Sequence, residues 1–323
     1  MTAGAITMID VLQARRRIAP YTHRTPLVHS AWLSALSGAD VRLKPESLQR
    51  SHSFKWRGAF NAVLARLERP GGAPARIVTA SAGNHGRALA AAAKTFNLPL
   101  VVFTPHDAPA SKLDAIRRDG ADLRPDGRDY DEAERMAKAF ARETGAEFIS
   151  PYSDADVIAG AATVAVEMFE DDPAIDTLLV PIGGGGLISG MATVAHAINP
   201  GCEVIGVELD VAHAFQQSVL AGRLVEIDAG ASLADGLGGN PDPETITFAY
   251  IQRLVDRIVT VSEADLAAAI AGLVEAEHLI AEGAGAATAA VLIGKRADVS
   301  GRRVGVIISG GNIDRARLAG LLS

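Results

Sequence analysis

The sequence predicts an α/β protein whose parallel β-sheets are covered by helices on both faces. From residue 77 onward, apolar runs of strand length alternate with segments of helical spacing, which is typical of parallel sheets. Some of these runs, such as Leu-Val-Val-Phe at 100–103, are continuously apolar, as in strands buried on both sides. Gly- or Ser-rich turns follow three of the runs, where open α/β sheets bind ligands.

The first quarter of the chain is less regular. Residues 8–18 have helical spacing, and Pro20 ends that helix. The segment 25–28 is extended, and the alternation at 41–44 predicts a strand. A further helix begins near Lys55 and ends before Pro-Gly-Gly at residues 70–72.

The remaining segments follow the alternating pattern. We expect strands at residues 77–80, 100–103, 121–123, 147–149, 177–182, 203–207, 258–261 and 304–308. We expect helices at residues 87–96, 110–118, 131–143, 156–169, 187–198, 213–221, 263–281 and 286–293. Residues 228–239 are Gly-rich and predicted to be irregular.

Composition limits the possible functions. The net charge is −7 and no long basic block is present, which argues against nucleic acid as a main partner. No apolar run reaches membrane-spanning length, and the first six residues lack the charged region of a secretory leader. A single cysteine, Cys202, allows no intrachain disulfide. We therefore expect a cytoplasmic protein that binds neither nucleic acid nor membrane.

Lys55 is the first candidate catalytic residue. It lies in Ser-Phe-Lys-Trp-Arg-Gly-Ala at 53–59, among aromatic and small side chains at a predicted helix start. Burial away from solvent lowers the pKa of a lysine, so that more of its amine is neutral and nucleophilic. The alternative is a surface lysine on a helix face.

Four consecutive glycines, Gly183, Gly184, Gly185 and Gly186, connect a predicted strand to a predicted helix. Such a loop exposes backbone N–H groups beside the positive end of the helix, so we expect it to bind phosphate. No Gly-Lys-Ser/Thr follows, which excludes a P-loop, and the glycine spacing differs from the dinucleotide fingerprint.

Two further turns carry polar groups to strand ends. In Ser-Ala-Gly-Asn-His-Gly at 81–86, Ser81 and the backbone could hold a carboxylate, and Asn84 could donate to a ring hydroxyl. Helix capping by Ser81 or Asn84 is compatible with both roles. His85 could be a general base, although packing beside a cofactor is favoured. Ser309 begins the second turn, Ser-Gly-Gly-Asn.

These segments, in this order, resemble the fold-type II pyridoxal phosphate enzymes, and within them the threonine/serine dehydratase and serine racemase group. Four segments match family motifs: Ser53 to Ala59, Ser81 to His85, the tetraglycine loop and the terminal Ser-Gly-Gly-Asn. Thr-Pro-Leu at 25–27 and Val-Ile-Ala-Gly at 157–160 match as well. The resemblance covers nearly the whole chain.

The resemblance implies a fold and a domain arrangement. It implies two three-layer parallel-sheet domains of the tryptophan synthase β-subunit-like architecture. Residues 1–74 and 147–323 would form the large cofactor-binding domain, and residues 75–146 a small mobile domain. We expect no regulatory domain after Ser323, and a homodimer or homotetramer.

The resemblance also implies the site. Lys55 would bind pyridoxal 5'-phosphate covalently and act as the base. Phe54 would pack on the pyridine ring, Asn84 would contact the ring hydroxyl, and Ser309 the pyridine nitrogen. A serine there, unlike a carboxylate, suits elimination or racemisation better than transamination. The phosphate would bind at Gly183, Gly184, Gly185, Gly186 and Leu187, and the substrate at Ser81, Ala82, Gly83, Asn84 and His85.

A divalent cation is a doubtful second cofactor. Glu208 matches the first ligand of the family's cation site, but the position of its aspartate is occupied by Ala214. No confident metal ligand is therefore expected, with Glu208 as the only candidate.

The implied reaction is removal of water from a β-hydroxy amino acid of the L-threonine or L-serine type, giving a 2-oxo acid and ammonia. Tyr152 and the pair Ala161-Ala162 depart from the family pattern, which leaves room for a bulkier or acidic substrate such as phenylserine or hydroxyaspartate. The sequence is also compatible with an amino-acid racemase, a non-enzymatic protein that binds the same cofactor, and an unrelated phosphate-binding α/β protein. Ala82 replaces the serine that these racemases carry, which favours the dehydratase.

Overall fold

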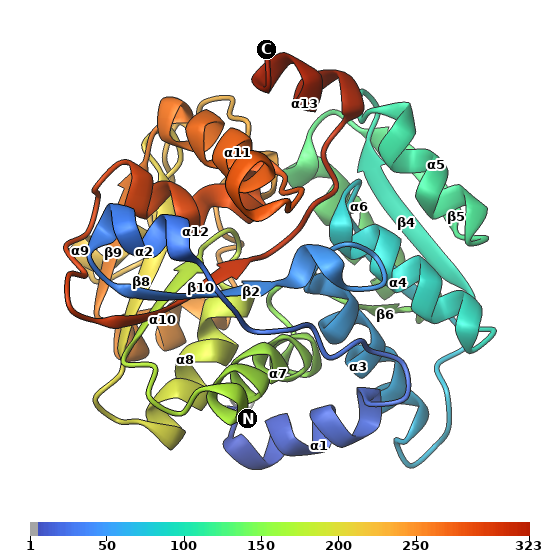
Figure 1. Ribbon diagram of the computed structural model, residues 1–323. Coiled ribbons are helices and arrows are strands. Elements are labelled where there is room, and N and C mark those ends of the chain that lie inside the picture. The colour runs from blue at the N-terminus through green and yellow to red at the C-terminus, as the bar shows by residue number, and fades with distance from the viewer. Residues whose placement is uncertain (1–5) are drawn as a thin grey trace.

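Two separate β-sheets organise the chain in a computed structural model that describes residues 6–323 (Figure 1). The larger sheet has six strands in the order β1-β2-β10-β7-β8-β9, and the smaller has four in the order β5-β4-β3-β6. The first five residues, in which no leader is expected, lie outside the described residues. The strands are β1 (Val28–His29), β2 (Asp40–Pro45), β3 (Ile77–Ala80), β4 (Leu100–Pro105), β5 (Asp122–Gly127), β6 (Glu147–Phe148), β7 (Thr177–Pro181), β8 (Glu203–Leu209), β9 (Arg257–Val261) and β10 (Arg303–Ile308).

The strand pairing confirms the predicted parallel sheets. Every pair is parallel except the short edge strand β1, which runs antiparallel to β2. In the centre of the larger sheet, Val306 lies opposite Leu43 of β2 and Leu179 of β7. The last strand to be synthesised thus closes the sheet between the first and middle parts of the chain.

Helices connect these strands and cover both sheets. They are α1 (Met8–Ile18), α2 (Ala31–Ser37), α3 (Lys55–Leu67), α4 (Asn84–Thr95), α5 (Ala110–Arg118), α6 (Tyr130–Thr144), α7 (Ala155–Asp171), α8 (Gly186–Ile198), α9 (Ala214–Ala221), α10 (Thr247–Leu254), α11 (Glu263–Glu277), α12 (Gly283–Ile293) and α13 (Arg315–Leu321). None of the helices among residues 6–323 is long and apolar enough to span a membrane.

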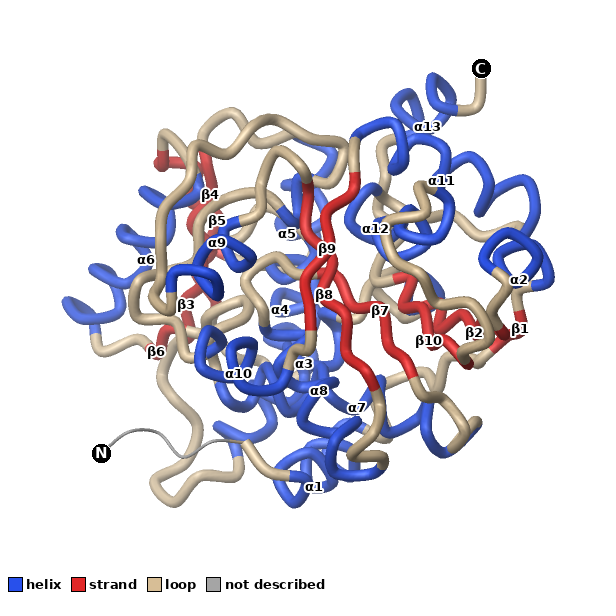
Figure 2. The backbone as a smooth tube through the Cα atoms, turned by 90° about the vertical axis from the view of Figure 1, so that its left-hand side faces the viewer, coloured by secondary structure: helices blue, strands red, loops and turns tan. Residues whose placement is uncertain are grey.

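Both sheets form three-layer units, as predicted. Along β10, Val306 and Ile308 face a core shared with α11 and α12, whereas Ile307 faces the core shared with α7 and α8. Figure 2 shows these two helix layers on either side of the larger sheet. In the smaller sheet, Ile77 faces α4 and Val78 faces α6 in the same alternating way.

The sheets differ from the sequence expectation at one boundary. Strand β6, which was expected to begin the second large-domain segment, pairs with β3 and belongs to the four-stranded sheet. That sheet therefore extends to Phe148. The division into a large and a small mobile domain stays a prediction.

Several helix predictions were wrong or incomplete. Helices α2, α10 and α13 were not predicted, and all three are short. Helix α11 was expected to reach residue 281 but ends at Glu277, because His278 takes a left-handed conformation with φ of 55°. The polar Ser30 caps α2 by accepting a hydrogen bond from Leu33 N, at 3.0 Å.

A buried charge network, defined by Arg57, Lys44, Glu46 and Glu167, fixes the first turn of α3. Arg57 is only 1% exposed, and its guanidinium donates to Glu46 at 2.8 Å and to Glu167 at 2.7 Å. Lys44 Nζ donates to the same Glu167, also at 2.7 Å. The charges of two cations and two carboxylates thus cancel in a buried site. Removing one of them would leave its partners buried without a compensating charge.

The network predicts a large stability loss when one member is removed. Arg57→Ala should lower the free energy of unfolding by about 3–5 kcal/mol, because Glu46 and Glu167 would remain buried with too few donors. Urea denaturation measures this directly. The control is Arg15→Ala, which breaks a pair with Glu170 that is 37% exposed on the arginine side and should cost less than about 1 kcal/mol. Equal losses in the two variants would contradict the role of the network.

Candidate active site

Lys55 lies at the first position of α3, where the chain is joined to the loop that follows β10. Phe54 N donates to Ser309 O at 3.0 Å, and Ser53 forms a β-bridge with Gly310. Lys55 Nζ donates to Pro151 O at 2.7 Å, and it lies 5.1 Å from the centre of the Phe54 ring. The structure therefore places Lys55, Phe54 and Ser309, three predicted site residues, next to one another.

The electrostatic surroundings of Lys55 suit a nucleophile. Burial lowers the pKa of its amine to about 8, and no carboxylate among the described residues opposes that shift. A larger fraction of the amine is consequently neutral near pH 7 than for an exposed lysine. The interpretation of Lys55 as a reactive group thus has a physical basis, and it stays a prediction.

The turn after β3 leads into α4, whose first turn lacks a side-chain cap. Gly83 occupies the N-cap position, and Ser81 Oγ accepts a hydrogen bond from Gly83 N at 3.3 Å rather than capping the helix. The capping suggested for Ser81 or Asn84 is therefore not observed. The N–H groups of Asn84 and His85, at the positive end of this helix, suit a carboxylate.

His85 is buried beside this turn. Neither ring nitrogen has a hydrogen-bond partner among the described residues. Burial, with a smaller contribution from the charge of Lys55, lowers the pKa of the His85 imidazole to about 3. The ring is therefore neutral near pH 7, so His85 has no imidazolium proton to give.

The tetraglycine loop joins β7 to the N-terminus of α8. Gly185 is the N-cap residue, with φ of 83°, and no side chain caps the helix. A Cβ on Gly184 would overlap the Tyr152 ring, and one on Gly183 would lie 2.7 Å from Gly236 O. The loop therefore excludes side chains and leaves the amides at the α8 N-terminus for an anion such as phosphate. The next residue, Leu187, is buried in the core.

Tyr152 packs directly against the tetraglycine loop. Its ring lies against Gly184, and its hydroxyl accepts a hydrogen bond from Asp242 N at 3.1 Å. By contrast, Ala161 and Ala162 are buried in the core between α7 and α8, where Gly190 contacts Ala162 closely. These two alanines therefore contribute to helix packing, and the suggested room for a bulky substrate stays a prediction.

A chain of four polar side chains, which we call the amide relay, crosses between the two sheets beside Lys55. Arg87 Nη1 donates to Asn312 Oδ1 at 2.6 Å, and Asn312 Nδ2 donates to Asn84 Oδ1 at 2.7 Å. Asn84 Nδ2 in turn donates to Glu282 Oε1 at 2.5 Å. The sequence analysis assigned no site role to Arg87, Asn312 or Glu282. Asn312 carried a signal as the last residue of a recognised motif, and Glu282 begins Glu-Gly-Ala-Gly at 282–285, where related proteins more usually have Glu-Pro/Ser-x-Gly.

Glu208 does not form a metal site. Its two carboxylate oxygens accept hydrogen bonds from Phe215 N at 3.0 Å and Gln216 N at 2.7 Å, in the first turn of α9. Residues 6–323 contain no group of three or more His, Cys, Asp or Glu side chains placed to bind a metal ion. The donor set around Glu208 therefore does not fit the divalent cation that was considered a doubtful cofactor.

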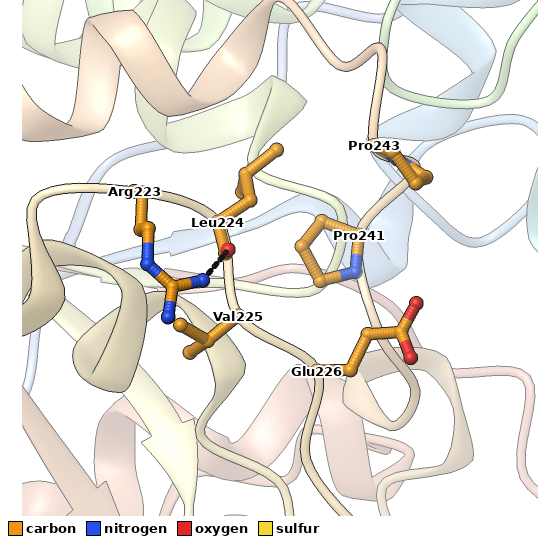
Figure 3. A pocket seen from close by; sticks show the side chains of 6 residues that line it. All are labelled: Arg223, Leu224, Val225, Glu226, Pro241 and Pro243. Carbon is orange, nitrogen blue, oxygen red and sulfur yellow. Dashed lines mark hydrogen bonds between the residues drawn. The ribbon is translucent and has the colours of Figure 1, made fainter.

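A surface pocket is lined by other residues. Figure 3 shows that its walls come from the loops around residues 223–226 and 241–243. It is lined by Arg223, Leu224, Val225, Glu226, Pro241 and Pro243. None of the predicted site residues lines it.

The residues around Lys55 fit pyridoxal phosphate. The amine of Lys55 can react with the cofactor's aldehyde. The uncapped N-termini of α4 and α8 suit a substrate carboxylate and the phosphate, respectively. The hydroxyl of Ser309 suits the ring nitrogen. Ser309 Oγ itself donates to Ala284 O at 3.1 Å, and its single hydrogen would have to turn to the ring nitrogen for Ser309 to donate there.

Comparisons with known proteins agree with this fit. Residues 18–310 match the family described as pyridoxal-phosphate dependent enzyme. The chain is 40% identical to an L-threonine ammonia-lyase of Thermotoga maritima, over 96% of this chain and 76% of that protein. It is 39% identical to an L-threo-3-hydroxyaspartate ammonia-lyase of Saccharomyces cerevisiae, over 97% of this chain and 95% of the other. Maize serine racemase superposes with a TM-score of 0.90 at 33% identity, over 98% of this chain and 97% of that one. The chain therefore belongs to the family of pyridoxal-phosphate-dependent enzymes.

Proposed function

We propose that this protein is an ammonia-lyase that removes water from L-threonine or L-serine and releases a 2-oxo acid and ammonia. The observation that carries the proposal is the environment of Lys55, an amine with lowered pKa close to an uncapped helix end suited to a substrate carboxylate. Relatives named as ammonia-lyases, at 39–40% identity over nearly the whole chain, support the same reaction class.

In the proposed reaction, the Lys55 amine takes the α-proton of the substrate. When bound, the cofactor supplies an electron sink for the carbanion. The β-hydroxyl then leaves with a proton as water, and the released enamine hydrolyses to the 2-oxo acid and ammonia. The α4 N-terminus and Ser81 would hold the substrate carboxylate throughout. The neutral Ser309 hydroxyl, in place of an acid, suits this elimination.

Elimination is favoured over racemisation because the opposite face lacks a proton donor. Racemisation needs a second acid/base group across from the lysine. Ala82 has no titratable group, and the buried His85 remains neutral at physiological pH. Ser81 is assigned to the carboxylate, which leaves it poorly placed for proton transfer.

L-threo-3-hydroxyaspartate is a second candidate substrate. It is supported by two relatives named L-threo-3-hydroxyaspartate ammonia-lyase, from Saccharomyces cerevisiae and a Pseudomonas species, which are 39% and 37% identical to this chain over 95% and 97% of their own lengths. The proposal also includes a cytoplasmic location, a mobile small domain over residues 75–146 and assembly as a homodimer or homotetramer. These three parts rest on the sequence pattern alone.

One prediction concerns product and stereochemistry. With L-serine, pyruvate and ammonia should form faster than D-serine, which coupled assays and chiral chromatography measure side by side. Ala82→Ser should raise racemisation relative to elimination, since a general acid/base typically contributes about a hundred- to ten-thousand-fold in rate. Faster formation of D-serine than of pyruvate by the unmodified enzyme would overturn the assignment. Ammonia release from threonine, serine, hydroxyaspartate and phenylserine then ranks the substrates.

Another prediction concerns divalent cations. Because Glu208 caps α9 and Ala214 has no side-chain oxygen, activity should be unchanged after dialysis against a chelator. The measurement compares 2-oxo acid formation before dialysis, after it, and after addition of magnesium or calcium. Reversible loss of activity in the chelator would show that other oxygen ligands bind a required cation.

A further inference from the structure

Tyr152 contacts the tetraglycine loop with both its side chain and its backbone. A Cβ on Gly184 would lie 2.1 Å from Tyr152 Cγ, and a Cβ on Gly186 would lie 2.8 Å from Tyr152 O. The two glycines therefore allow residue 152 to approach the loop more closely than any side chain would permit. Tyr152 is only 7% exposed, so most of its ring area is withdrawn from water at this contact.

Four consecutive glycines do not hold one backbone conformation by themselves. Glycine populates a wider range of backbone angles than other residues, and the loop has no side chains of its own that could pack. Neighbouring groups must therefore fix it. Thr247 Oγ1 donates to Gly184 O at 2.8 Å, and the Tyr152 ring lies against the Cα of the same glycine. Gly184 is thus held at its carbonyl by one side chain and at its Cα by the other.

The Tyr152 ring is itself held at its far end. Its hydroxyl accepts a hydrogen bond from Asp242 N at 3.1 Å, and the Asp242 carboxylate pairs with Lys138 of α6. A tyrosine side chain has only two χ angles, so fixing the hydroxyl also fixes the ring. The ring therefore cannot swing away from Gly184 without breaking the hydrogen bond to Asp242.

The residue before Tyr152 contacts the amine of Lys55. Pro151 O accepts the hydrogen bond from Lys55 Nζ at 2.7 Å. Consecutive Cα atoms are about 3.8 Å apart, so residues 151 and 152 connect the amine to the tetraglycine loop through a single peptide unit. Pyridoxal phosphate carries its aldehyde and its phosphate-bearing arm on adjacent ring carbons. The groups that bind these two parts must therefore lie close together, and this short link keeps them so.

We propose that Tyr152 is a positioning residue, whose ring holds the tetraglycine loop in the conformation that binds the phosphate of pyridoxal phosphate. The inference rests on the proposed binding of that phosphate at residues 183–186. Its physical basis is pre-organisation. Without the ring the loop populates further conformations, and the apparent affinity falls in proportion to the fraction that can still bind. This role concerns the cofactor and is independent of which amino acid is the substrate.

The test compares pyridoxal phosphate with pyridoxal, which has the same ring and aldehyde but no phosphate. Full-length protein freed of cofactor is titrated with each compound, and equilibrium dialysis gives the two dissociation constants. Their ratio measures the contribution of the phosphate. Tyr152→Ala should raise the dissociation constant of pyridoxal phosphate about tenfold, as expected if about one tenth of the loop population keeps the binding conformation, and leave that of pyridoxal unchanged.

Two results with Tyr152→Ala would overturn the inference. One is that neither dissociation constant changes. The other is an equal rise for both compounds, which is the signature of a general structural defect rather than of a lost phosphate site. If the alanine variant does not fold, Tyr152→Leu replaces it with the same expectation, because leucine fills much of the space without supplying a flat ring.

Tyr152→Phe separates the ring from the hydroxyl. It retains the contact with Gly184 and loses only the hydrogen bond from Asp242 N. The dissociation constant of pyridoxal phosphate should therefore rise by no more than about fivefold, the size of one neutral hydrogen bond. A loss as large as that of the alanine variant would assign the effect to the hydroxyl and contradict the role of the ring.

The matched control is Tyr250→Ala on α10. Tyr250 is 6% exposed, close to the value for Tyr152, and its ring shares a core with Ile6 and Ile158. Removing this equally buried ring should leave the ratio of the two dissociation constants unchanged. The same change in the ratio as in Tyr152→Ala would show that the loss of any buried ring is sufficient, and the inference would fail.

Gly185→Ala distinguishes this inference from the assignment of the phosphate site. Gly185 has φ of 83°, and a Cβ there would lie 2.8 Å from Ile251 Cδ1, so the change distorts the loop on a side that Tyr152 does not contact. If Gly185→Ala leaves the ratio of the two dissociation constants intact, the phosphate does not bind at the loop. If Gly185→Ala changes the ratio and Tyr152→Ala does not, only the role of Tyr152 fails.

Discussion

The buried pairing of Arg57 with Glu46 and Glu167 is the constraint on which the rest of the structure depends. Arg57 lies two residues after Lys55, and its partners come from the turn that follows β2 and from α7. The guanidinium thus fixes the start of α3 against both the sheet and its helix layer. Since the amine of Lys55, which we propose to be catalytic, projects from that same turn, its position is set by charges that water does not screen.

Around this fixed point, the two sheets contribute different groups to one site. The six-stranded sheet supplies the tetraglycine loop and Ser309, while the four-stranded sheet supplies the Ser81–His85 turn. The amide relay and the ion pair between Lys138 and Asp242 cross from one part to the other. The residues proposed to bind substrate and cofactor therefore lie where strands of both sheets end, which is where open α/β proteins bind ligands.

The sequence was a good guide wherever local chemistry determines structure. The position of the turn at residues 183–186 and that of the continuously apolar strands were predicted from the residue pattern, and the structure has both where they were expected. The end of α11 was missed because a histidine, rather than a glycine, takes the left-handed position. The contacts of Arg87 and Glu282 could not be predicted, because they depend on hydrogen bonds between residues about two hundred positions apart. The burial of Ala161 and Ala162 likewise depends on the neighbouring α8.

The central claim is that Lys55 carries the cofactor, and peptide mapping tests it most directly. The holoenzyme is treated with borohydride, which makes the link between lysine and cofactor permanent, and is then digested and analysed by mass spectrometry. The account predicts that the added phosphopyridoxyl mass lies on Lys55 alone. The same mass on Lys44, Lys112 or Lys138 with Lys55 unmodified would contradict it.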